Sequence, residues 1–130
     1  RLDTDIAGAN AAGLPSLMVL TGVSSARDAV EAVAKQRPTY IARDLRSLHD
    51  DAGLLAVTAQ PDWQVHISSA AVTVDSGRLG ADGDGLSIVR AVARAVWDAD
   101  FDGRSFTVHP GDDTARDALQ HWSLLTDAVD

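Results

Sequence analysis

The residues best suited to chemistry in this sequence are two aspartates, Asp3 and Asp5, which precede an alanine- and glycine-rich segment. Carboxylates hold hard cations such as Mg²⁺, either directly or through bound water. An apolar segment at residues 17–20 follows and leads into Thr-Gly. Open parallel sheets bind ligands at the carboxyl ends of their strands, so this spacing is compatible with an active site. Acidic residues at a helix start also serve simply as caps, and spacing alone leaves both interpretations open.

The elements that must position these aspartates are a helix followed by a buried strand. We predict the helix over residues 7–13, with Thr4 or Asp3 as its cap and Gly13 as its end. Asp5 in the first turn suits the positive end of the helix dipole. The segment 17–20 lacks polar alternation, which is typical of a strand covered on both faces. The order therefore predicts a parallel sheet with helices on each side.

A second helix is predicted over residues 24–35, with Ala29, Val30 and Val33 on one apolar face. Gln36-Arg37-Pro38 ends it, and a short strand follows at residues 39–42. A short helix is predicted at residues 45–49. The first 50 residues thus indicate an α/β arrangement.

The sequence Arg-Leu-Asp-Thr-Asp-Ile at residues 1–6, together with the segments 7–13 and 17–23, resembles the last motif of the haloacid-dehalogenase superfamily. The similarity is to the NagD-type phosphatases, which include phosphoglycolate, pyridoxal-phosphate and glycerol-phosphate phosphatases. Arg-Pro-Thr-Tyr-Ile at residues 37–41 is similar to the closing segment of that family, so the resemblance covers roughly residues 1–50. In the family, a magnesium-binding aspartate precedes the arginine of the motif, and a second acidic residue follows it. That second position matches Asp5, whereas Asp3 matches no position assigned to the metal.

The resemblance implies that this chain is part of a magnesium-dependent phosphomonoesterase acting through a phospho-aspartyl intermediate. The implied substrate is a small phosphorylated metabolite of the glycerol 3-phosphate or phosphoglycolate type. Asp5 would orient the water ligands of Mg²⁺ without binding the ion directly. The catalytic aspartates, the phosphate-binding groups and the cap domain would lie in an N-terminal remainder of the same protein. No catalytic residue is therefore expected in this chain, and the chain alone is expected to be inactive.

A different pattern begins after residue 52, where we predict the boundary between a phosphatase part, residues 1–52, and an extension, residues 53–130. Alternating polarity at residues 63–67 and 71–75 predicts an antiparallel hairpin. A long helix is predicted over residues 86–97, with Arg90 and Arg94 on its solvent side. A strand at 105–108, a turn at 109–111 and a final helix complete the chain. The residues expected inside are Ile88, Val89, Val92 and Val96 on the long helix and Ala115, Ala118, Leu119 and Trp122 on the last, which Asp112 or Asp113 caps.

This order resembles the second half of a GNAT-type acetyltransferase fold. In that family, a glycine-rich turn with a basic residue holds the pyrophosphate of acetyl-CoA at a helix N-terminus. Here Gly80 occupies the basic position, and Asp82 and Asp84 place negative charge in the turn. We therefore predict a degenerate, structural or regulatory extension without acetyl-CoA binding. The alternative is a non-catalytic binding or interaction module built on a degenerate acyltransferase-like fold, and titration with acetyl-CoA distinguishes a true transferase.

The amino-acid composition argues against nucleic acid and membranes as partners. The 130 residues carry 19 acidic and 11 basic side chains, a net charge of -8, which argues against nucleic acid. No apolar run is long enough for a membrane span, and the absence of cysteine is compatible with a cytoplasmic location. The four histidines have no metal-ligand spacing. The three tryptophans are expected in the core of the extension, although one of them at the surface would suit a homodimer contact.

Overall fold

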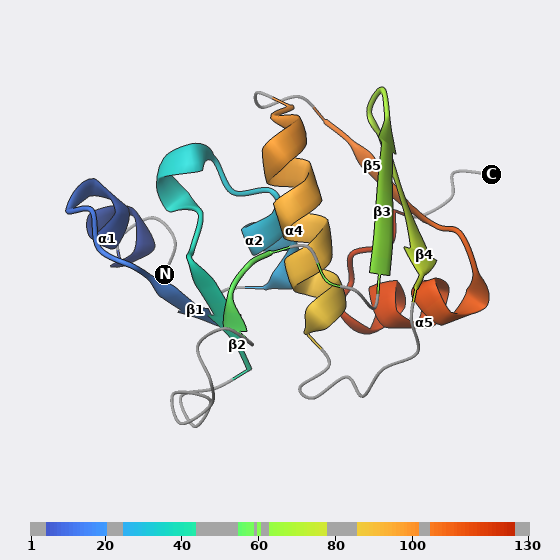
Figure 1. The fold of residues 1–130 in the computed structure, drawn as a ribbon, viewed down its shortest axis with the longest axis horizontal. Coiled ribbons are helices and arrows are strands. Elements are labelled where there is room, and N and C mark those ends of the chain that lie inside the picture. Colours follow the sequence, from blue (N-terminus) through green and yellow to red (C-terminus); the bar gives the residue numbers. More distant parts are fainter. Residues whose placement is uncertain are drawn as a thin grey trace.

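The chain forms two small sheets on either side of a central helix (Figure 1). The computed structural model describes residues 5–20, 25–43, 55–58, 60, 63–77, 86–101 and 105–126. Its elements are α1 (Ala7–Ala11), β1 (Leu17–Val19), α2 (Ala26–Val30), the 3₁₀ helix η2 (Ala34–Gln36), β2 (Tyr40–Ala42), β3 (Trp63–Ser68), β4 (Ala71–Ser76), α4 (Ser87–Ala99), β5 (Thr107–Pro110) and α5 (Asp113–His121). The α/β class predicted from the sequence is confirmed. The predicted helix at 45–49 lies outside the described residues.

The first sheet pairs β1 with β2 in parallel, and Leu17 lies opposite Tyr40. Met18 and Ile41 face the interior, at 3% and 0% exposure. On the far side of β2, Ala56 forms an antiparallel bridge with Tyr40. The predicted parallel strand is confirmed at Leu17–Val19, but full cover on both faces is not, because Met18 is buried while Leu17 and Val19 are only partly buried.

The second sheet has the order β3-β4-β5. The hairpin of β3 and β4 is antiparallel, as predicted, while β5 pairs in parallel with β4 after the crossover through α4. The predicted turn at His109 and Pro110 is wrong, because β5 runs from Thr107 to Pro110, and Val74 pairs with Pro110. Proline lacks an N–H group to donate. Because Pro110 is the last residue of an outer strand, the sheet loses few hydrogen bonds.

Helix α4 connects the two sheets through a shared hydrophobic core. Ile88, Val89 and Val92 are fully buried, as their helical spacing predicts. The helix contacts β3 on one side and α2 on the other (Figure 1). Buried residues from both halves of the sequence form one core cluster, so the extension and the phosphatase-like part pack as a continuous interior.

The tryptophans take the inward positions expected of them. Trp97 is 5% exposed, and its indole N–H donates to the carbonyl of Ala29 in α2 at 3.1 Å. The indole N–H of Trp63 donates to the Ser87 hydroxyl at 2.9 Å, and Trp122 is partly buried against the core. Because Ala29 and Trp97 are 68 positions apart, the first bond ties the two halves of the sequence together.

The predicted solvent face of α4 is correct at Arg94 and wrong at Arg90. Arg94 is half-exposed and pairs with Asp98 one turn later, at 2.6 Å. Arg90 is only 3% exposed, and its Nε and Nη2 groups donate to the carbonyl of Ile41 at 3.2 and 2.5 Å. The cause is the position of β2 beside α4, which covers a helix face that an isolated amphipathic helix would leave in water.

Helix α2 is shorter than predicted. Ser25 and Asp28 form a capping box at its start, but the helix ends at Val30 and Glu31 is its C-cap. The chain then passes through η2 to Arg37, whose extended backbone suits the residue before a proline. Val33, predicted on the apolar face, is 49% exposed as a result.

The last helix is capped by Asp112, one of the two residues predicted for this role. Its carboxylate accepts bonds from the N–H of Ala115 at 2.8 Å and from the N–H and hydroxyl of Ser76 at 2.8 and 2.7 Å. Bonds from the N–H groups of Ala115 and Ser76, and then from the Ser76 hydroxyl, lower the pKa of Asp112 below its usual value. The cap therefore joins α5 to the end of β4.

A lowered pKa in the folded state means that ionised Asp112 stabilises the fold above its unfolded pKa, and that this stability is lost as the pH falls through the folded value. We expect the difference in Tm between the wild-type protein and Asp112→Asn to be full near pH 6 and to shrink below about pH 4. Thermal unfolding between about pH 2 and pH 6 measures it. Asp113→Asn is the control, because Asp113 accepts none of the three bonds. An Asp112→Asn difference that stays constant down to pH 2 contradicts the assignment.

Among the described residues, no helix has both the length and the apolar character needed to cross a bilayer.

Candidate functional site

Asp5 lies at the surface, in a π-helical turn directly before α1. Its neighbour Ile6 is 4% exposed and belongs to the core cluster. The backbone of Asp5 is thus fixed on one side by a buried residue, while the carboxylate stays accessible to water. The predicted caps Thr4 and Asp3 lie outside the described residues, and the N-cap of α1 is Ile6, without a side-chain bond. Gly13 ends this segment with φ at 73°, as predicted.

A network of hydrogen bonds fixes α1 against the approach to β2. The side-chain amide of Asn10 donates to the carbonyls of Lys35 and Arg37, at 2.9 and 3.0 Å. Ser16 and Thr39 exchange bonds, since the N–H of Ser16 donates to the Thr39 hydroxyl oxygen at 3.1 Å and the N–H of Thr39 donates to the Ser16 carbonyl at 2.9 Å. The turn that carries Asp5 is therefore attached to a braced helix, which is what a positioned carboxylate requires.

The donor chemistry of Asp5 fits a water ligand of magnesium. A carboxylate is a hard oxygen donor, and Mg²⁺ keeps several waters that such groups orient. The described residues hold no group of three or more His, Asp or Glu side chains able to bind a metal. The indirect role of Asp5 stays a prediction.

The described histidines are at the surface, and two of them make ordinary polar contacts. His66 lies 3.5 Å from Asp75 across the β3–β4 hairpin. His109 contacts the Thr107 hydroxyl at 2.8 Å, and His121 packs edge-on against Trp122. His49 lies outside the described residues. That the four histidines form no metal site stays a prediction.

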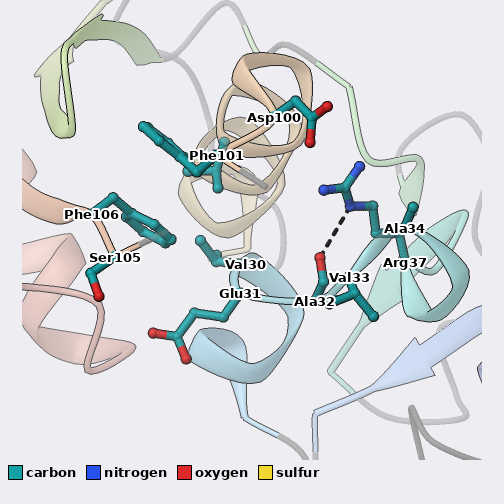
Figure 2. Close-up of a pocket in the computed structure, with 11 residues that line it drawn as sticks. Val30, Glu31, Ala32, Val33, Ala34, Arg37, Asp100, Phe101, Ser105 and Phe106 are labelled. Atoms are coloured by element: carbon teal, nitrogen blue, oxygen red, sulfur yellow. Dashed lines mark hydrogen bonds between the residues drawn. The ribbon is translucent and has the colours of Figure 1, made fainter. Parts of the chain in front are cut away.

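A pocket of about 470 Å³ opens between α2, the segment after it, and the end of α4 (Figure 2). It is lined by Val30, Glu31, Ala32, Val33, Ala34, Arg37, Val96, Asp100, Phe101, Ser105 and Phe106. Asp5 is not among these residues, so the pocket and the predicted metal position are separate features. The sequence interpretation missed the pocket because a helix continued to residue 35 would have filled the space that the early end of α2 leaves open.

The glycine-rich turn at residues 80–85, on which the prediction about acetyl-CoA rests, lies outside the described residues. The boundary predicted between residues 52 and 53 lies outside them as well. Both stay predictions.

Comparison with known proteins gives two family matches on different parts of the chain. Residues 1–48 match the HAD-hydrolase-like family, and residues 60–124 match the GCN5-related N-acetyltransferase-like domain. A D-glycerol 3-phosphate phosphatase from Mycobacterium tuberculosis is 61% identical over 132 residues, which cover 96% of this chain and 37% of that protein.

Two solved structures of the glycerol phosphate phosphatase from Mycobacterium tuberculosis have the same fold over the length of this chain. The complex with calcium gives a TM-score of 0.90 at 62% identity, covering 98% of this chain and 38% of that one. The complex with magnesium gives 0.86 at 62% identity, covering 96% and 36%. The chain thus spans under two fifths of the length of these relatives. Over residues 60–124 it belongs to the GCN5-related N-acetyltransferase-like domain family, while its first 48 residues are similar to the HAD-hydrolase-like family.

Proposed function

We propose that the full-length protein carrying this chain is a magnesium-dependent phosphatase that hydrolyses glycerol 3-phosphate. The observation that carries the proposal is the 61% identity to a D-glycerol 3-phosphate phosphatase over 96% of the chain. The crystallised relative was obtained with magnesium, the ion whose water ligands suit the Asp5 carboxylate.

The proposed reaction passes through a phospho-aspartyl intermediate, formed by an aspartate that this chain does not contain. Magnesium supplies positive charge that offsets the charge on the transferring phosphoryl oxygens. Asp5 accepts hydrogen bonds from metal-bound water and thereby orients it. The braced α1 helix and the buried Ile6 hold this carboxylate in place. The role of Asp5 is positioning, because its side chain need not touch the substrate.

The extension, residues 53–130, is proposed to be structural or regulatory. Its support is the number of bonds that cross from it to the phosphatase-like part. Trp97 donates to Ala29, Arg90 donates to Ile41, and Arg27 donates to the carbonyl of Leu124 at 3.1 Å. An independently moving module would not need a shared core and buried bonds of this kind. A homodimer and an N-terminal remainder of the same chain remain the proposed macromolecular partners.

The test is release of inorganic phosphate by the full-length protein from a panel of phosphomonoesters. The panel contains both enantiomers of glycerol 3-phosphate, phosphoglycolate and pyridoxal phosphate. We expect the highest kcat/KM with a glycerol 3-phosphate, loss of activity with a chelator, and recovery on adding Mg²⁺. Preference for phosphoglycolate overturns the substrate assignment, and the absence of hydrolysis with every ester overturns the function.

A further inference from the structure

The pocket of Figure 2 lies where the phosphatase-like part meets the extension. One wall comes from the segment before β2, between Val30 and Arg37, and the other from residues 96, 100, 101, 105 and 106, at the end of α4 and beyond it. Its volume of about 470 Å³ is within the range of small-molecule sites in proteins. A molecule bound here would touch both parts at once.

Part of the pocket wall is apolar. Phe101 and Phe106 stack with ring centroids 5.2 Å apart and planes at 17°. Val30 and Val96 are 2% and 5% exposed, whereas Val33 is 49% exposed. An apolar group placed against the phenyl rings and Val33 would remove this surface from water, which is the main source of affinity in such sites.

Arg37 presents a held guanidinium to the pocket. Its Nε donates to the carbonyl of Ala32 at 3.1 Å, and its Cζ lies 5.7 Å from the centroid of the Trp97 ring. The two Nη groups make no hydrogen bond within the part of the chain that the structure describes. A guanidinium with one edge fixed and its terminal donors open is arranged to bind a carboxylate through two parallel bonds.

Asp100 presents a carboxylate in an unfavourable place. It is the C-cap of α4, with φ at 51° and ψ at 71°, a left-handed conformation held by a bond from its N–H to the Val96 carbonyl at 3.2 Å. A negative charge at a helix C-terminus adds to the negative end of the dipole. No ion pair or hydrogen bond to its carboxylate is found among the described residues. An ammonium group bound there would offset the negative charge at the helix C-terminus and would give the carboxylate a partner.

The charged side chains of the pocket lining determine which class of ligand fits. Glu31, the other carboxylate of the lining, already pairs with Arg27 at 3.3 Å. The open groups are therefore one guanidinium and one carboxylate, and Figure 2 shows Arg37 and Asp100 facing each other across the opening. A phosphorylated anion would meet Asp100 and Glu31 as like charges, whereas a zwitterion satisfies Arg37 and Asp100 together.

We propose that this pocket binds a free α-amino acid with an apolar side chain. The ligand carboxylate pairs with Arg37, its ammonium with Asp100, and its side chain packs on Phe101, Phe106 and Val33. Occupancy joins the segment after α2 to the end of α4 and so stabilises the contact between the phosphatase-like part and the extension. This site is distinct from the proposed metal position at Asp5, and its existence does not depend on the phosphatase activity.

The test is calorimetric titration of the full-length protein with L-leucine, L-isoleucine, L-valine, L-methionine and L-phenylalanine, each up to about 10 mM. We expect at least one to bind with a Kd at or below about 1 mM, and its decarboxylated amine and its deaminated acid to bind at least tenfold more weakly. Arg37→Gln and Asp100→Asn should each weaken binding by about 10- to 100-fold.

The matched control is Arg94→Gln. Arg94 also lies over the Trp97 ring, at 5.5 Å, but it pairs with Asp98 and does not line the pocket. Its removal should leave the Kd unchanged, and the Tm of each variant checks that it is folded. The proposal is overturned if no amino acid of the series binds, or if binding is equally strong in Arg37→Gln and Asp100→Asn. Because the experiment measures the heat of binding, it tests the pocket independently of whether the protein releases phosphate.

Discussion

We expect Asp5→Asn in the full-length protein to lower the kcat for phosphate release by about 10- to 100-fold, the usual effect of removing a group that orients metal-bound ligands. Asparagine keeps the size of the side chain but replaces the charged carboxylate, which would accept hydrogen bonds from metal-bound water, with a neutral amide. The Mg²⁺ concentration for half-maximal activity should rise in the same variant. Steady-state phosphate release over a magnesium titration measures both quantities.

Asp117→Asn is the control for Asp5→Asn, because Asp117 is an exposed aspartate on α5, outside the phosphatase-like part. It should leave kcat and the magnesium requirement unchanged. The stability of the Asp5 variant should stay within about 0.5 kcal/mol of wild type, since Asp5 is at the surface and the neighbouring Ile6 still anchors the turn. A folded Asp5→Asn enzyme with wild-type rate and magnesium dependence excludes the positioning role.

The features that the sequence predicted well depend on short-range rules. The Asp112 cap, the Gly13 helix end and the β3–β4 hairpin follow from the conformational preferences of a few adjacent residues. The buried face of α4 follows from helical spacing alone. In each of these cases the determining contacts are within the element or between neighbouring strands.

The features that the sequence did not predict depend on distant partners. Arg90 and Arg94 are one turn apart on α4, and the first is buried beside the carbonyl of Ile41, 49 positions away in the sequence. Likewise, no glycine or proline beside Val30 predicts that α2 ends there. The helix ends where it packs against α4. A sequence pattern shows which face of a helix is apolar, but it does not show which other segment of the chain packs against that helix.

The two candidate sites differ in the same way. The assignment of Asp5 depends on the resemblance of a contiguous motif, since the spacing of Asp3 and Asp5 alone favours capping. The pocket escaped prediction because Arg37 and Asp100 belong to segments with separate family matches and meet only in the folded chain. Their individual signals are slight: an arginine before a proline, and an aspartate just past a long helix.

We expect Arg90→Met to lower the free energy of unfolding of the full-length protein by about 2–4 kcal/mol. Methionine fills much of the space of the arginine stem, so the loss falls on the polar contacts of the guanidinium, which include two charge-assisted bonds to the carbonyl of Ile41. A buried acceptor that loses its donor costs about 1–3 kcal/mol by itself. Urea unfolding followed by circular dichroism measures the change.

Arg94→Met is the matched control, since it removes the same side chain one turn later, where the pair with Asp98 is largely exposed. Exposed pairs of this spacing contribute about 0.5 kcal/mol or less. The difference between the two variants therefore isolates the burial of Arg90 and its bond to β2, which joins the extension to the phosphatase-like part. Equal losses in the two variants would mean that this bond adds nothing beyond a surface ion pair, and that the shared apolar core alone holds the two parts together.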